Sequence, residues 1–228
     1  MMPRAKFDRS LLPERPDLSF EREIWRNGAR LVAGVDEAGR GALAGPVSAG
    51  VVILPHDRPQ LEERLAGVRD SKQMTPAARE GWAEIIKENA LAWAVGFASS
   101  TEIDRLGIVP ATRLAARRAL DDLDCGIEHI LIDYLILPDL NFPQTPLVKG
   151  DARSLSIAAA SVLAKTARDA QMVEMDALYP GYFLASNKGY ATSAHREAVT
   201  KLGPCAEHRC SFSPVAEFYG LFPPKKGE

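Results

Sequence analysis

The apolar positions of the chain gather into short runs, and the first clear pair lies within residues 31–54. The run LVAGV contains small and β-branched residues without polar alternation, which is typical of a strand buried on both faces. A second run, PVSAGVVIL, follows a connection that contains Gly39, Gly41 and Gly45, and glycine permits the backbone conformations of a tight turn. The pattern therefore predicts a β-hairpin of two buried strands.

Downstream of the hairpin, strand-like runs alternate with amphipathic stretches. Residues 90–98 and 127–137 are expected to be strands, because both are continuous apolar runs. Helices are expected where apolar residues recur at helical spacing, and several of them follow a capping residue. They are a short helix near 20–25, residues 75–89, a short helix capped by Ser100 or Thr101, 111–123, 154–178, a helix from Thr192 to Gly203-Pro204, and one capped by Ser213-Pro214. These elements predict a mixed α/β sheet flanked by helices, with a helical C-terminal part.

Two adjacent carboxylates, Asp36 and Glu37, end the first apolar run. Burial of two ionised carboxylates side by side is costly unless a cation or a set of hydrogen-bond donors compensates, and a divalent metal ion is the simplest compensator. Consecutive strand side chains point to opposite faces, so both reach one ion only if the strand twists or ends there. Gly39 and Gly41 permit such a turn. The pair is therefore a candidate catalytic and metal-ligating site.

The glycines of this segment have a second interpretation, a phosphate-binding loop of the dinucleotide type. That fingerprint requires a helix directly after the glycines. Here Val47, Val51 and Ile53 predict a strand instead. The dinucleotide interpretation is therefore disfavoured.

Two further carboxylates stand at informative places. Asp133 is the single charge in the apolar centre of residues 127–137, and Asp151 lies on the turn before the long helix. Oxygen ligands suit a hard cation such as Mg²⁺ or Mn²⁺, and two such ions about 4 Å apart can activate a water and stabilise the departing oxygen of a phosphodiester. The sequence therefore predicts metal-dependent phosphodiester cleavage, provided that the fold brings Asp36 and Asp133 close together.

Composition narrows the class of protein. With 228 residues, 46% of them hydrophobic and 25% charged, the chain suits one globular domain. No apolar stretch approaches the roughly 20 residues of a membrane span, and MMPRAKFDRS lacks the apolar core of a signal peptide, so a soluble cytoplasmic protein is expected. Three cysteines without C-x-x-C spacing are expected to be reduced thiols. The net charge of −2 offers no argument for nucleic-acid binding, which must rest on individual sites.

Six segments stand in a fixed order along the chain. They are Asp36-Glu37-Ala38-Gly39-Arg40-Gly41, Asp70-Ser71-Lys72, Ile132-Asp133, Lys149-Gly150-Asp151 with SIAAASVLAKTARD, Lys188-Gly189-Tyr190-Ala191-Thr192 with His195, and His208-Arg209 with Ser211-Phe212. In this order, over residues 31–219, the chain closely resembles bacterial ribonuclease HII. The resemblance implies a ribonuclease H-like catalytic domain at 31–220, after an extension at 1–30 without a chemical role and before a flexible tail at 221–228.

The resemblance also implies an activity. Members of this family are metal-dependent endonucleases that cut the RNA strand of RNA–DNA hybrids and incise 5′ of ribonucleotides embedded in duplex DNA, leaving 3′-OH and 5′-phosphate ends. By this resemblance, Asp36, Glu37 and Asp133 ligate Mg²⁺ or Mn²⁺, with two ions in the catalytic state, and Asp151 is the fourth active-site carboxylate. Asp169 is a rival for that fourth place, but we expect it to make a surface pair. A monomer that acts in ribonucleotide excision repair is expected.

The same resemblance assigns substrate contacts. The turn of Gly39, Arg40 and Gly41 would recognise the ribose 2′-OH, because glycines let the backbone approach the sugar. The Tyr190 ring would stack on the deoxyribose that follows the ribonucleotide. Weaker assignments are phosphate contacts for Lys72 and Lys188 and structural or phosphate-side roles for His195 and His208.

One departure from the family pattern concerns the residue after the third carboxylate, where glycine is common and this chain has Tyr134. The departure puts the local turn in question. Ribonuclease HIII is a rival, but it usually carries a large N-terminal domain and lacks the Gly-Arg-Gly turn. Two other rivals are a catalytically silent hybrid-binding module and a nucleotide-binding oxidoreductase, which the intact carboxylates and the predicted hairpin disfavour.

Overall fold

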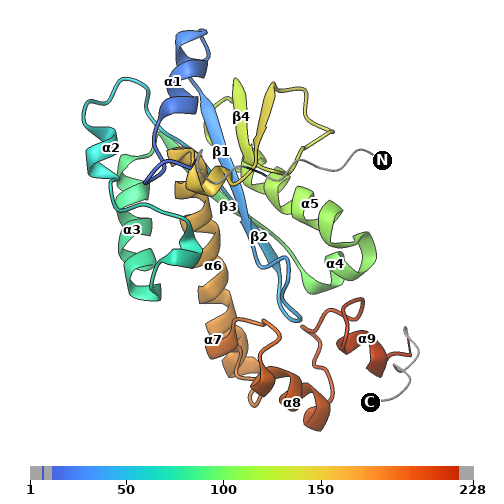
Figure 1. The fold of residues 1–228 in the computed structure, drawn as a ribbon. Coiled ribbons are helices and arrows are strands. Elements are labelled where there is room, and N and C mark those ends of the chain that lie inside the picture. The colour runs from blue at the N-terminus through green and yellow to red at the C-terminus, as the bar shows by residue number, and fades with distance from the viewer. Residues whose placement is uncertain (1–6, 8–11, 221–228) are drawn as a thin grey trace.

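The computed structural model describes residue 7 and residues 12–220. Its centre is a five-stranded sheet with the strand order β3-β2-β1-β4-β5 (Figure 1). The strands are β1 (Val32–Ala38), β2 (Val47–Ile53), β3 (Ala92–Ala98), β4 (His129–Asp133) and β5 (Gln144–Leu147). Pairing is antiparallel from β1 to β2 and from β2 to β3, and parallel from β1 to β4 and from β4 to β5. The predicted mixed sheet is confirmed.

The predicted hairpin forms the middle of this sheet. Strands β1 and β2 pair in a continuous antiparallel register from Ala33 opposite Ile53 to Ala38 opposite Ser48. Every position of β2 is buried, and so is every position of β1 except the partly exposed Glu37. Burial on both faces explains why the two strands are apolar without alternation.

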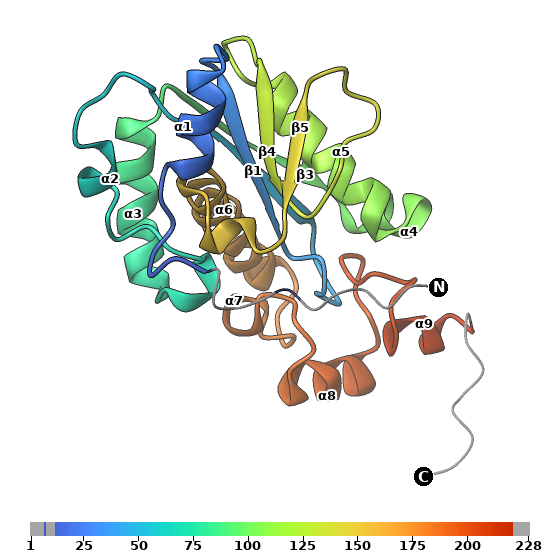
Figure 2. The same ribbon diagram turned by 45° about the horizontal axis from the view of Figure 1, so that its top comes forward.

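Helices cover both faces of the sheet (Figure 2). One layer contains α1 (Ser19–Arg26), α2 (Leu61–Arg64), α3 (Pro76–Asn89) and the long α6 (Leu155–Leu178), and the other contains α4 (Ser100–Leu106) and α5 (Ile108–Asp121). The C-terminal helices α7 (Leu184–Asn187), α8 (Ser193–Leu202) and α9 (Val215–Phe218) lie beyond the end of the hairpin (Figure 1). Short 3₁₀ turns cover Ser71–Gln73 (η2) and Gly150–Ala152 (η3). None of the described helices could span a membrane.

Glycines let α6 approach the sheet closely. A Cβ atom on Gly50 of β2 would collide with the Ala160 carbonyl oxygen, and one on Gly34 of β1 would collide with the backbone of Ser156. The small residues at the start of α6 meet these glycines, so helix and sheet backbones come into direct contact. This contact holds the long helix against β1, which carries Asp36 and Glu37, and against its neighbour β2.

Several predicted helix starts are confirmed by their caps. The side chains of Thr75, Ser154 and Thr192 each accept a hydrogen bond from a backbone N–H in the first turn. The expected cap of α4 was wrong by one residue, because Ser99 and Glu102 form a reciprocal capping box there. Helix α9 begins after Ser213-Pro214 as expected but has no side-chain cap.

The run 127–137 was expected to be one strand, and this prediction was too long. Strand β4 ends at Asp133, because Tyr134 adopts a left-handed conformation with φ of 56°. Asp133 therefore stands at the end of a strand rather than in its centre. Tyr134 keeps a turn of the kind that glycine would favour, at a conformational cost of about 1–2 kcal/mol for a residue with a Cβ. The chain thus preserves the turn that the departure from glycine had put in question.

The division into an extension, a catalytic domain and a tail stays a prediction. Residues 221–228 lie outside the described part of the chain. Within the described part of the extension, Trp25 of α1 is buried in the main hydrophobic core. All three cysteines are free, as expected.

The close contact of α6 with β2 can be tested by substitution. We expect Gly50→Ala to destabilise the protein by about 2–3 kcal/mol, because the added methyl forces the Ala160 backbone away from the sheet. The matched control is Gly81→Ala in α3, where the new Cβ meets open space and should stabilise the helix by about 0.5–1 kcal/mol. Urea unfolding monitored by circular dichroism measures both changes. Equal effects of the two substitutions would contradict the packing argument.

Candidate active site

The ends of two parallel strands bring the first and third carboxylates together. In the register of β1 and β4, Val35 lies opposite Ile132, so Asp36 and Asp133 are the next residues on neighbouring strands. Turn η3 lies beside them, since the Gly150 N–H donates a 2.7 Å hydrogen bond to Oδ1 of Asp133. Asp151 is the next residue in that turn. Residues that are distant along the chain thus meet at one edge of the sheet.

Burial strengthens the repulsion between these carboxylates and raises their pKa values. Asp36 is only 3% exposed, and burial, followed by the charges of Glu37 and Asp133, raises its pKa well above the ordinary value. Burial also raises the pKa of Asp133 and that of Asp151, and neighbouring carboxylates add to both effects. The protein therefore concentrates negative charge where water cannot fully solvate it, which calls for a cation.

Lys72 provides one positive charge at this site. Its Nζ lies 3.6 Å from Oδ2 of Asp151, and its side chain is 73% exposed. Burial lowers the pKa of Lys72, but the charges of Asp70, Asp36, Asp151 and Asp133 outweigh burial and raise it overall. The Asp70 carboxylate also fixes the η2 turn by accepting a hydrogen bond from the Lys72 N–H. A protonated lysine therefore lies next to Asp151 at this site.

The site has donor atoms that suit a divalent metal ion. Oδ2 of Asp36 is buried and has no hydrogen-bond partner in the described residues. An oxygen of this kind, among carboxylates with raised pKa values, matches the preference of Mg²⁺ and Mn²⁺ for oxygen ligands. In the described conformation, no three His, Cys, Asp or Glu side chains within residues 12–220 already form a closed metal-ligand cluster. Glu37 is instead paired with Arg40, whose Nη1 lies 2.9 Å from Oε1.

The Gly-Arg-Gly turn follows β1 and is held from behind by Arg209. The Arg209 side chain is fully buried and donates 2.8 Å hydrogen bonds to the carbonyl oxygens of Gly39 and Arg40. It also binds the carbonyl oxygens of Gly45 and Pro46. One planar guanidinium group therefore fixes both ends of the loop 39–46.

Arg168 of α6 joins this loop to the turn that carries Tyr190. Its Nε donates to the Pro46 carbonyl oxygen at 2.8 Å and its Nη1 to that of Lys188 at 2.9 Å. Gly39 has φ of 91°, and a Cβ there would collide with the Arg168 side chain. The Tyr190 ring is 36% exposed and lies 5.5 Å from the Arg168 guanidinium. The two proposed sugar-contacting turns are thus neighbours.

Comparison with known proteins identifies the family. The family description "Ribonuclease HII" matches residues 33–215. The chain belongs to the ribonuclease HII family. It is 56% identical over 194 residues to the Ribonuclease HII of Moorella thermoacetica, which covers 85% of this chain and 92% of that protein. Like its family, it is an endonuclease of the ribonuclease H type.

Solved structures agree on the fold. The ribonuclease H2 of Pyrococcus horikoshii OT3 matches with a TM-score of 0.68 at 25% identity, covering 83% of this chain and 97% of that one. Bst-RNase HIII in complex with Mn²⁺ matches with a TM-score of 0.64 at 21% identity, covering 85% of this chain and 70% of that one, and supports the fold alone. The predicted ribonuclease H-like architecture is confirmed.

Arg168 and Arg209, which bind the turns described above, had no assigned role in the sequence analysis of this ribonuclease HII chain. Both lie within quoted motifs, but an arginine in a motif is usually read as a phosphate contact or a solvated charge. A signal was present for Arg168, because it continues the buried i, i+4 series of Ala164 and Met172 on α6. A charge on the buried stripe of a helix indicates a buried interaction.

Other predicted residues have protein partners. Nζ of Lys188 donates to the Ala185 carbonyl oxygen at 2.6 Å. Asp169 lies 2.9 Å from Nη2 of Arg79 and 2.7 Å from Nζ of Lys165. These three side chains are largely buried, so the expectation that Asp169 makes a surface pair was wrong. Asp169 joins α3 to α6 instead of facing the carboxylates.

His195 and His208 form a buried pair behind Tyr190. Their Nε2 atoms are 3.1 Å apart, and Nδ1 of His195 lies 2.9 Å from the Tyr190 carbonyl oxygen. Nδ1 of His208 accepts a hydrogen bond from the Cys205 N–H. Burial lowers the pKa of His195, and burial together with His195 lowers that of His208 to about 4. Neutral, mutually bonded imidazoles of this kind support the chain around Tyr190.

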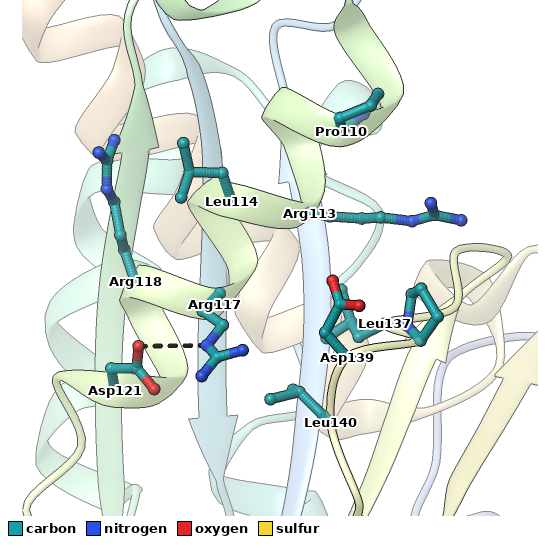
Figure 3. A pocket seen from close by; sticks show the side chains of 10 residues that line it. Pro110, Arg113, Leu114, Arg117, Arg118, Asp121, Leu137, Asp139 and Leu140 are labelled. Carbon is teal, nitrogen blue, oxygen red and sulfur yellow. Dashed lines mark ion pairs between the residues drawn. The ribbon is translucent and has the colours of Figure 1, made fainter. Parts of the chain in front are cut away.

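A separate pocket lies between α5 and the loop after β4 (Figure 3). The residues that line it include Leu114, Leu137, Leu140, Arg113 and Arg117. Nε of Arg113 donates to the Ile136 carbonyl oxygen, and Arg117 pairs with Asp121. None of the four candidate carboxylates lines this pocket, so it is not the active site.

The buried charge of Asp36 predicts a gain in stability when it is removed. A carboxyl group whose folded-state pKa lies above its unfolded value binds protons more tightly when folded, so the metal-free protein loses stability as pH rises through that pKa. We expect Asp36→Asn to stabilise the protein at pH 7.5 by on the order of 1 kcal/mol, or about 2–4 °C in Tm, in the presence of a chelator. The exposed control Asp121→Asn should change Tm little. A lower Tm for Asp36→Asn would contradict the argument.

The histidine pair predicts sensitivity to acid. Because the folded-state pKa of His208 is depressed from 6.5 to about 4, its contribution to stability is complete above pH 6.5 and is lost as pH falls from there to 4. The loss is on the order of 3 kcal/mol. We expect the unfolding free energy of His208→Gln to fall less steeply over this interval than that of the wild type. Urea titrations at several pH values measure the two slopes, and equal slopes would refute the assignment.

Proposed function

We propose that this chain hydrolyses the RNA strand of RNA–DNA hybrids and incises duplex DNA on the 5′ side of embedded ribonucleotides, leaving 3′-OH and 5′-phosphate ends. The observation that carries the proposal is the meeting of Asp36, Asp133 and the turn of Asp151 at one edge of the sheet, next to the Gly-Arg-Gly turn. We propose that it acts as a cytoplasmic monomer in the removal of ribonucleotides from DNA.

Asp36, Glu37 and Asp133 would hold one or two Mg²⁺ or Mn²⁺ ions, with Asp151 as the fourth carboxylate. The unpartnered Asp36 oxygen and the raised pKa values of Asp133 and Asp151 support this assignment. The Mn²⁺ complex of Bst-RNase HIII, which shares the fold, is consistent with it. Bound divalent cations would lower the pKa of a water and offset the charge of the phosphate. The Glu37 carboxylate is paired with Arg40 in this structure. To ligate a metal ion, Glu37 would therefore have to release Arg40.

The remaining groups would position the substrate. Lys72 stays protonated beside Asp151 and can bind a phosphate oxygen, since its ammonium is exposed. Gly41 has open space around it, so the backbone of the turn can approach a ribose 2′-OH. The partly exposed ring of Tyr190 offers a face for the next sugar, where a second hydroxyl would be disfavoured. Lys188 can reach a phosphate after it releases the Ala185 carbonyl oxygen.

The proposal is tested with duplex DNA that contains one ribonucleotide and a labelled 5′ end. We expect a single nick immediately 5′ of the ribonucleotide in the presence of Mg²⁺ or Mn²⁺ and none with a chelator. Asp36→Asn and Asp133→Asn should each lower the rate at least about 1,000-fold while binding of the duplex stays measurable, because the fold does not depend on these charges. Mapping of the nick on a sequencing gel and a gel-shift assay measure the two effects.

The control variant is Asp121→Asn, which removes a carboxylate far from the site and should cut at the wild-type rate. A nick 3′ of the ribonucleotide, ends that carry a 2′,3′-cyclic phosphate, or full activity of Asp36→Asn would refute the proposed reaction.

A further inference from the structure

Glu21 of α1 is a buried carboxylate with no role in the proposed reaction. It is 0% exposed, and no cation pairs with it among the described residues. Burial raises its pKa, and its Oε2 atom has no hydrogen-bond partner there. A lone buried carboxylate is costly, and an apolar residue of similar size would avoid that cost. The position of Glu21 therefore requires an explanation other than stability alone.

Among the described residues, the hydrogen bonds that the Glu21 side chain accepts from other residues come from the start of α6. Its Oε1 atom accepts from Oγ of Ser154 at 2.6 Å, from Oγ of Ser156 at 2.6 Å and from the Ser156 N–H at 2.9 Å. Ser154 is the N-cap of α6, and its Oγ also accepts from the Ile157 N–H. Glu21 thus orients the cap while it binds a free N–H at the positive end of the helix dipole.

The backbone near Glu21 also forms hydrogen bonds with the residues at the start of α6. The Leu155 N–H donates to the Asp17 carbonyl oxygen at 2.8 Å, and the Asp17 N–H donates to that of Arg153 at 3.3 Å. The Arg153 guanidinium lies 4.8 Å from the ring of Phe20. Residues 17–21 therefore clamp residues 153–156 through both backbone and side chain.

The clamped residues lead directly to the carboxylates. The Ser154 N–H donates to the Gly150 carbonyl oxygen at 2.8 Å, which closes the η3 turn around Asp151. Gly150 also acts as a donor, because its N–H donates to Oδ1 of Asp133 at 2.7 Å. A continuous series of hydrogen bonds runs from Glu21 through Ser154 and Gly150 to Asp133.

We infer that Glu21 is a positioning residue of the active site: through Ser154 it fixes the η3 turn that presents Asp151, and through Gly150 it fixes the orientation of Asp133. The inference rests on the catalytic roles proposed for Asp133 and Asp151. It assigns a function to a segment that the sequence analysis had placed outside the catalytic domain and without chemistry. Glu21 acts only through other residues and touches neither substrate nor metal.

The inference is tested with Glu21→Ala and Glu21→Gln. Loss of the clamp in Glu21→Ala should lower kcat about 10- to 100-fold, because a small displacement of a catalytic group is enough for such a loss, and should leave KM for the ribonucleotide-containing duplex within about 2-fold. Glu21→Gln should recover most of kcat, since the amide oxygen can accept the same three hydrogen bonds. Ser156→Ala, which removes one of the three, should fall between them.

The matched control is Trp25→Leu, which removes buried volume from α1 but none of the hydrogen bonds that join Glu21 to residues 154–156. It should lower Tm but leave kcat unchanged. A loss of kcat in Trp25→Leu equal to that in Glu21→Ala, at temperatures where both are folded, would assign Glu21 a purely structural role and overturn the inference. So would a kcat of Glu21→Ala within about 2-fold of the wild type.

Amide hydrogen exchange separates this inference from the proposed function. In the metal-free protein without substrate, the Gly150 and Ser154 N–H groups should exchange faster in Glu21→Ala than in the wild type and in Trp25→Leu. This readout remains valid even if the wild type does not cut the duplex, in which case the proposed function alone fails. Unchanged exchange of both N–H groups in a folded Glu21→Ala protein would overturn the inference; if that variant does not fold, the same comparison is made with Ser156→Ala.

Discussion

Two buried guanidinium groups hold together the part of the molecule on which substrate recognition would depend. The loop 39–46 leaves the sheet and carries carbonyl oxygens that no strand can pair, and buried carbonyl groups without partners are costly. Arg209 and Arg168 bind these oxygens with the fixed, planar donors that only arginine provides. Neither arginine pairs with a carboxylate among the described residues. Burial and the nearby charge of Arg168 lower the pKa of Arg209 to about 9, and the hydrogen bonds of its guanidinium group go to backbone carbonyl oxygens.

The charges of the molecule are therefore separated into two neighbouring regions. The buried guanidinium groups of Arg168 and Arg209 bind the loop that contains the glycine turn. The carboxylates lie at the strand ends and in η3, with Asp36 the most buried of them, and pair only with the more exposed Arg40 and Lys72 among the described residues. A pairing of the two sets would leave no free carboxylate oxygen for the metal ion that we propose to bind here. Buried carboxylates such as Asp36 are costly in the free protein, which is consistent with the metal-binding role proposed for them.

The sequence was sufficient for features that depend on local patterns. The hairpin, the caps Thr75 and Thr192, and the long α6 with its start near Ser154 follow from apolar runs and capping residues, and the family follows from its ordered motifs. The sequence was insufficient where tertiary contacts determine the backbone conformation or the hydrogen-bond partner of a residue. Tyr134 ends β4 in a conformation that a tyrosine seldom adopts, and nothing local to Arg168 or Glu21 indicates which carbonyl or hydroxyl each one binds. In the sequence, Arg168 and Glu21 are recognisable only as charged residues at positions where the helical pattern predicts an apolar side chain.

Helix α6 explains how these separate features reach one site. It meets β1 at Gly34 through Ser156, and it meets Gly39, directly after β1, through Arg168. The twelve helical steps between those helix residues span about 18 Å, and the five strand steps between the glycines span about 17 Å. The helix and the strand thus match in length and run side by side, with Asp36 between the two contacts. The N-terminus of α6 is clamped beside Asp151, and its middle holds the turns of Arg40 and Tyr190, so one rigid element sets the spacing between the carboxylates and the turns proposed to contact the sugar.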